Sequence, residues 1–110
     1  MANKFNDLQK LERRIVRAVA EDAIAYGYDV SVHDEEEVAV PYTTSMFDIM
    51  AEVGATDMTY LHFRDRRSGN YTGWVMFVHG NGHEVLTDHT ANPDVDDIVS
   101  RAMGVSELVF

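Results

Sequence analysis

Two neighbouring runs of aromatic and β-branched residues, 57–64 and 71–79, constrain the fold more than any other feature of the chain. Such residues favour strands, and the polar turn at 65–70 predicts that the two runs pair as a β-hairpin. Apolar side chains lie on both sides of the second run, with Trp74, Met76 and Val78 on one side and Val75 and Phe77 on the other. This pattern is typical of a strand covered on two faces. We therefore expect either helices on both faces of the sheet or a second copy of the chain over one face.

The rest of the chain predicts three helices and three further strands. The helices are expected at residues 6–26, 46–53 and 94–103, and the strands at 29–33, 37–40 and 83–88. The connections between strands are short enough for hairpins, which favours antiparallel pairing. The order is thus α-β-β-α-β-β-β-α, and we expect a single α+β domain over residues 1–110. Its antiparallel sheet has about four to five strands, with helices packed on it.

Several residues mark where these elements begin and end. Asn6 followed by Gln9 predicts a capping box at the start of the first helix. Pro41 lacks a backbone donor, so it is expected to end the second strand and to place that strand at an edge. Gly104 is expected to end the last helix. The apolar tail 105–110 is expected to dock on the sheet or on a partner.

The composition excludes several classes of chemistry. The chain of 110 residues has no cysteine, which excludes disulfides, thiolate metal sites and a cysteine nucleophile. It has no phosphate-cradling loop, dinucleotide fingerprint or Gly-x-Ser-x-Gly elbow. Its uncharged stretches are too short to cross a bilayer, and the first residues lack the apolar core of a signal peptide. We therefore expect a cytoplasmic protein without a membrane partner and without a cofactor.

The charge indicates what kind of partner the surface would attract. Nineteen Asp and Glu against nine Lys and Arg give a net charge of −10. The electrostatic field of such a charge repels nucleic acid and anionic membranes and attracts a basic partner toward the protein. Many acidic proteins, however, carry their charge only for solubility. The acids expected to make the contacts lie at a predicted hairpin tip and at a predicted helix start: Asp34, Glu35, Glu36, Asp94, Asp96 and Asp97.

The histidines offer an alternative. His79 and His83 flank a tight turn, and with Glu84 they form an imidazole and carboxylate set that suits a transition metal. Their spacing is not that of a known zinc motif. The simpler interpretation, which we favour, is that they are ordinary turn and sheet-surface histidines.

Three segments of the chain resemble a family of small acidic proteins encoded on phages and plasmids of proteobacteria. They are residues 9–16 (QKLERRIV), 28–32 (YDVSV) and 73–90 (GWVMFVHGNGHEVLTDHT). The family is described mostly as hypothetical proteins, so the resemblance implies a genetic setting and no catalytic residue. Small accessory proteins of mobile elements often act stoichiometrically, by binding and blocking a host protein.

We therefore expect a non-enzymatic acidic binding protein that contacts a host protein or complex with a basic surface. One such function is a counter-defence inhibitor of the anti-CRISPR kind, which imitates the charge of nucleic acid and does not bind nucleic acid itself. The first alternative is a metal-binding protein or metal-dependent enzyme using His79, His83 and Glu84. The second is a self-associating regulatory module, a homodimer through residues 74–78 or 108–110.

Overall fold

The helices begin at the side chains that the sequence marks as caps. The computed structural model describes residues 6–35 and 37–108, and it describes residues 105–108 by their backbone alone. The helices are α1 (Asp7–Ala25), α2 (Met46–Glu52) and α3 (Pro93–Leu108). The Asn6 side chain accepts a hydrogen bond from the Gln9 backbone N–H at 2.8 Å, and the Gln9 side chain accepts one from the Asn6 backbone N–H at 3.0 Å. The predicted capping box is thereby confirmed. It satisfies backbone donors that lack a partner within the first helical turn.

The strands form one antiparallel sheet with the order β2-β1-β3-β4-β5. They are β1 (Tyr28–His33), β2 (Val38–Thr43), β3 (Met58–Asp65), β4 (Tyr71–Val78) and β5 (Leu86–His89). The predicted α+β class and the predicted order of helices and strands are both confirmed.

Two strand boundaries differ from the prediction by three residues, and the others by at most one. β2 is an edge strand as expected, but it continues past Pro41 to Thr43. An edge strand tolerates proline where the missing N–H would face outward, because no ladder bond is lost there. The last strand starts at Leu86 and not at residue 83, because residues Gly82–Glu84 form a short 3-10 turn, η1.

The last helix is longer than the sequence predicts. α3 continues through Gly104 to Leu108, and Gly104 is not among the glycines with positive φ. Glycine inside a helix costs only about 1 kcal/mol relative to alanine, so it does not oblige a helix to end. The predicted tail at 105–110 is therefore helical up to residue 108, while residues 109–110 lie outside the described part.

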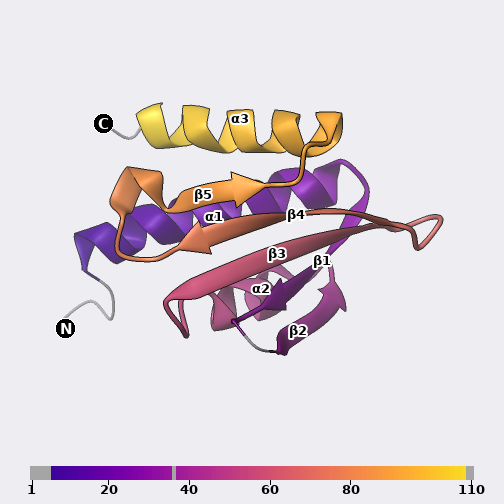
Figure 1. Ribbon diagram of the computed structural model, residues 1–110, viewed down its shortest axis with the longest axis horizontal. Coiled ribbons are helices and arrows are strands. Elements are labelled where there is room, and N and C mark those ends of the chain that lie inside the picture. Colours follow the sequence, from indigo (N-terminus) through magenta and orange to yellow (C-terminus); the bar gives the residue numbers. More distant parts are fainter. Residues whose placement is uncertain (1–5, 36, 109–110) are drawn as a thin grey trace.

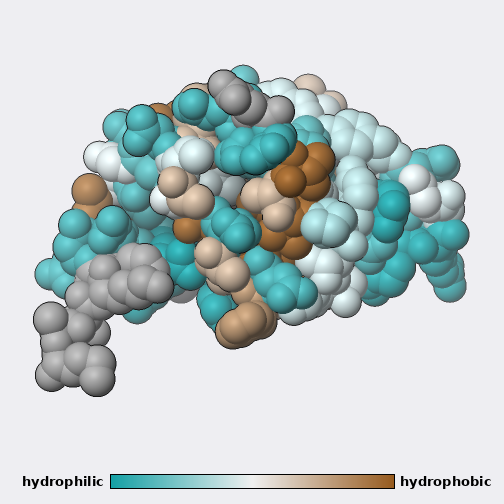
Figure 2. Space-filling view, turned by 90° about the horizontal axis from the view of Figure 1, so that it is seen from below, coloured by the Kyte–Doolittle hydropathy of each residue, from teal (hydrophilic) through white to brown (hydrophobic). Residues whose placement is uncertain are grey.

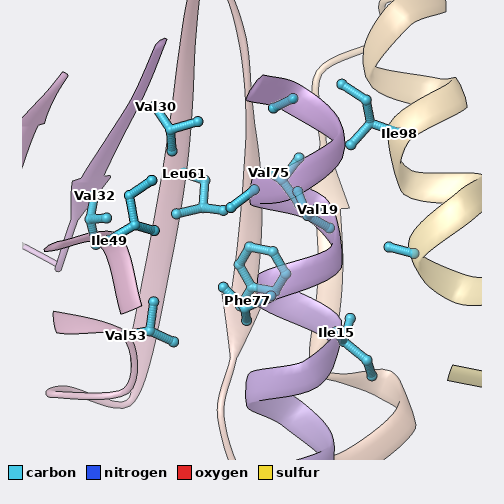
Figure 3. Packing of buried hydrophobic residues seen from close by; sticks show 14 of the residues in the cluster. Ile15, Val19, Val30, Val32, Ile49, Val53, Leu61, Val75, Phe77 and Ile98 are labelled. Atoms are coloured by element: carbon cyan, nitrogen blue, oxygen red, sulfur yellow. The ribbon is translucent and has the colours of Figure 1, made fainter. Parts of the chain in front are cut away.

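The three described helices cover the same face of the sheet (Figure 1). The close-up shows strand side chains pointing toward side chains from all three helices (Figure 3). The labelled residues are Val30, Val32, Leu61, Val75 and Phe77 from the strands, Ile15 and Val19 from α1, Ile49 and Val53 beside them, and Ile98 from α3. Of the two expected alternatives, helices on both faces is thus wrong for the described chain, whereas a second copy over the uncovered face stays a prediction.

The helical backbone at Gly104 predicts that Gly104→Ala stabilises the protein by about 0.5–1 kcal/mol in urea unfolding. A Cβ at this position would meet no atom within 4 Å. Gly73→Ala is the matched control: its Cβ would lie 2.9 Å from Thr90 Oγ1, so it should destabilise by about 1–3 kcal/mol. Destabilisation by Gly104→Ala would instead indicate a helix end at this residue.

Candidate functional site

The face of the sheet that points away from the helices is the candidate site, and we call it the open face. It carries Asp29, His33, Tyr42, Tyr60, His62, Arg64, Tyr71, Trp74, Met76 and Val78. The register aligns these side chains in rows across the strands: His62 pairs with Trp74, and Tyr60 pairs with Met76. Since β-strand side chains alternate between faces, the buried Leu61 and Phe63 point toward the helices while their neighbours point outward.

Ring side chains on the open face pack against one another. The His62 ring lies 4.1 Å from the His33 ring and 6.4 Å from the Tyr60 ring, measured between centroids. The Tyr60 ring meets Trp74 edge-on at 6.5 Å. His62 also shares a hydrogen bond of 2.8 Å between its Nδ1 and the Tyr71 hydroxyl. These contacts hold the rings in place without a covering helix; His33, Tyr60, His62 and Trp74 are half-buried, and Tyr71 is exposed.

A hollow of about 410 Å³ lies at the end of the open face next to the β1–β2 hairpin. Its aromatic floor consists of His33, Tyr60, His62 and Trp74, its acidic rim of Asp34, Glu35 and Glu37, and Val38 lines it as well. The rim is held by the hairpin itself, because the Asp34 side chain accepts a 2.9 Å hydrogen bond from the Glu37 backbone N–H. Aromatic rings under a carboxylate rim form a site suited to a cation.

Apolar surface is exposed around the same hairpin. The view from below shows hydrophobic side chains gathered over β2 and α2, with hydrophilic ones around them (Figure 2). Val38 on β2 is 53% exposed and lines the hollow, whereas Phe47 on α2 is 84% exposed and belongs to the helical layer. Val38 therefore adds an apolar contact next to the acidic rim.

The two histidines of the floor are neutral at pH 7. Burial, and to a smaller extent the nearby His33, together lower the pKa of His62 to about 4. Burial also lowers the pKa of His33, although the Asp34 carboxylate opposes this shift. The histidines therefore do not offset the negative charge of the rim.

The far end of the open face holds a cation of its own. The Arg64 guanidinium lies over the Tyr42 ring, 4.3 Å from its centroid. The same guanidinium donates to Asp29 Oδ2 at 3.1 Å. Asp29 also accepts from Arg66 Nε at 3.1 Å. Arg64 is thus held between a ring and a carboxylate by its own chain.

The structure separates the six acids that the sequence suggested as contacts. Asp34 and Glu35 line the hollow, and Glu36 lies outside the described residues. The others lie near the start of α3, where Asp94 accepts a hydrogen bond from the Tyr28 hydroxyl and Asp97 accepts one from the Tyr26 hydroxyl. Tyr28 begins β1 and Asp34 follows its end, so at about 3.3 Å per residue the two groups lie roughly 20 Å apart along the strand.

Asp94 and its neighbours also have structural partners. Asp96 lies 3.5 Å from His89 Nδ1. Burial and the hydrogen bond to Asp94 raise the pKa of Tyr28 to about 12. Asp94 therefore ties α3 to the start of β1, and Asp96 lies beside the end of β5, whereas Asp34 and Glu35 border a hollow.

His79, a metal candidate from the sequence, lies in a polar cluster under the sheet. Its Nε2 is 2.7 Å from Thr59 Oγ1, and its Nδ1 is 3.6 Å from Glu12 Oε1. Burial lowers the pKa of His79, and the Glu12 carboxylate opposes the shift. His83 and Glu84 are exposed on η1. No three His, Asp or Glu side chains in the described part of the chain are grouped to hold a metal ion, so His79, His83 and Glu84 are not brought together as ligands.

Glu12 itself is a structural anchor that the sequence did not reveal. It is only 2% exposed, and one of its oxygens accepts hydrogen bonds from the backbone N–H groups of Gly80 and Gly82 at 2.8 and 2.7 Å. The carboxylate thereby ties α1 to the turn between β4 and η1. A buried carboxylate needs such donors to offset the loss of water.

No family model, curated protein or solved structure matches this chain. None of the described helices is both long and apolar enough to cross a membrane. The function therefore has to be inferred from the geometry and charge of the open face.

The sequence contains a signal for this face. Tyr60, His62 and Arg64 alternate along β3, as Trp74 and Met76 do along β4. What the alternation does not show is that Tyr60, His62 and Trp74 surround one hollow together with Asp34, because this depends on β1 lying between β2 and β3.

The neutral state of His62 predicts that stability falls as the pH is lowered from about 6.5 to 4. In this pH window the His62 side chain is protonated in the unfolded chain but stays neutral in the folded protein, so lowering the pH favours unfolding. His62→Phe keeps a ring and should flatten part of the dependence in urea unfolding across this range. His83→Gln, at an exposed position, is the control. An unchanged slope in His62→Phe would contradict the assignment.

The anchoring role of Glu12 predicts that Glu12→Ala destabilises the protein by about 2–4 kcal/mol, because two backbone N–H groups lose their acceptor. Chemical unfolding measures this directly. The control is Glu21→Ala, which removes an exposed pair with Arg17 at 3.5 Å and should cost less than about 0.5 kcal/mol. Equal small losses in both variants would show that the carboxylate does not hold the turn.

Proposed function

We propose that this protein is a non-enzymatic binding protein that holds a basic segment of a partner protein, one to one, on the open face of its sheet. The observation that supports this most is the hollow, in which aromatic rings lie beneath Asp34, Glu35 and Glu37. Rings and carboxylates both attract a cationic side chain, and the overall charge of −10 steers such a partner toward the protein.

Aromatic side chains on a sheet also suit the stacking of nucleic-acid bases, but the charges here oppose it. Proteins that stack single strands combine the rings with a positively charged groove. The hollow has carboxylates where phosphates would approach, and no Lys or Arg of the described chain lines it. Arg64, on the same face, is already held by Asp29. A basic protein segment therefore fits this surface better than nucleic acid.

A second copy of the chain fits less well. A two-fold contact places the same surface patch against itself. Here it would place the acidic rims of two strongly acidic molecules close together, which is unfavourable. A basic partner relieves the same repulsion.

In the setting implied by the resemblance to phage and plasmid proteins, the partner is a host protein whose basic surface serves nucleic acid. Stoichiometric occupation of that surface by an acidic protein would block it, as a counter-defence inhibitor does. The acidic rim supplies the charge and the aromatic floor supplies contact area.

Trp74 is the only tryptophan in the chain and lies in the floor of the hollow, so its fluorescence reports occupancy. A peptide rich in lysine and arginine should change the emission of Trp74 with one-to-one stoichiometry. Asp34→Asn/Glu35→Gln/Glu37→Gln should weaken this binding about tenfold at low salt, because three carboxylates of the rim are neutralised.

The matched control is Asp94→Asn/Asp96→Asn/Asp97→Asn, which removes the same charge at the start of α3 and should change the affinity less than about threefold. Equal losses would show that binding follows net charge and not the hollow. A response to oligothymidylate without one to the peptide would favour nucleic acid. Peptide-independent dimerisation in light scattering, abolished by Trp74→Ala, would favour self-association.

A further inference from the structure

The hollow combines features that distinguish between cations of different shape. We infer that it holds an arginine side chain of the partner, with the guanidinium plane against the aromatic floor and its N–H groups toward the acidic rim. The inference rests on the proposed function, because it names the group by which a basic segment is held.

The open face already holds one guanidinium in this manner. Arg64 lies 4.3 Å from the centroid of the Tyr42 ring and donates to Asp29 at 3.1 Å. The hollow offers the same two components, rings and carboxylates, but from different residues and without a Lys or Arg of the described chain to fill it. The intramolecular contact is therefore a structural precedent for an intermolecular one on the same sheet face.

The components of the hollow match a guanidinium better than an ammonium ion. A guanidinium is planar and weakly hydrated, so it stacks on ring faces while its N–H groups bind carboxylates in a forked geometry. The lysine ammonium is compact and strongly hydrated, and it benefits from charge more than from stacking. A floor of four rings beside the rim thus favours arginine.

The size and charge of the hollow agree with this occupant. Its volume of about 410 Å³ lies within the range of roughly 300–1,000 Å³ seen for small-ligand pockets. Among the described residues, the charged groups facing it are Asp34, Glu35 and Glu37, and the titratable groups of the floor are His33, Tyr60 and His62. The lowered pKa values of the two histidines keep them from repelling a cation at pH 7.

The test compares two peptides that differ only in having arginine or lysine at every basic position, titrated into the full chain with Trp74 emission and calorimetry as readouts. The arginine peptide should bind about five- to tenfold more tightly. Equal affinities would overturn the arginine inference and leave the proposed binding of basic segments standing. Failure of both peptides to bind would overturn both proposals.

A ring variant separates stacking from charge. Tyr60→Leu keeps an apolar side chain in the floor but removes one ring, so it should reduce arginine affinity toward that of lysine and leave the lysine peptide within about twofold. Phe47→Leu, an exposed ring change in the helical layer, is the control and should preserve the preference. A preference unaltered in Tyr60→Leu and in His62→Leu would overturn stacking in the hollow.

Discussion

The structure depends on the burial of one face of a five-stranded sheet beneath the three described helices. Val30, Leu61, Phe63 and Val75 are fully buried beneath them. Burying such side chains supplies about 1.5–3 kcal/mol each. Once the apolar sides of the helices are used in this way, the opposite face has to be stabilised by its own side chains.

The open face meets that requirement with rings. His33, Tyr60, His62 and Trp74 shield one another from water, so they remain half-buried without a covering layer. The same mutual burial keeps the imidazoles neutral, so the carboxylates of the hairpin set the charge around the hollow. One packing solution therefore accounts for both the stability of this face and its attraction for cations.

Acidic residues of similar appearance in the sequence have three different roles in the fold. Glu12 is buried and anchors the Gly80–Gly82 turn to α1, Asp94 accepts a hydrogen bond from Tyr28, and Asp34 borders the hollow. Sequence patterns could place each acid on its helix or hairpin, but they could not assign these roles. The hydrogen-bond partner of Asp94 is 66 residues away in the sequence, and Gly82, a partner of Glu12, is 70 residues away. The separation of Asp34 and Glu35 from Asp94, Asp96 and Asp97 follows from the same long-range packing.

The sequence by itself determined the α+β class, the order of helices and strands, the capping box at Asn6 and the edge position of the Pro41 strand. These features depend on local periodicity, on backbone donors and on side chains a few residues apart. Only the tertiary structure decided which face of the sheet the helices cover and which acids meet the rings of Tyr60 and Trp74. A strand that is apolar on both sides fits either arrangement, and the choice depends on how helices distant in the sequence pack together.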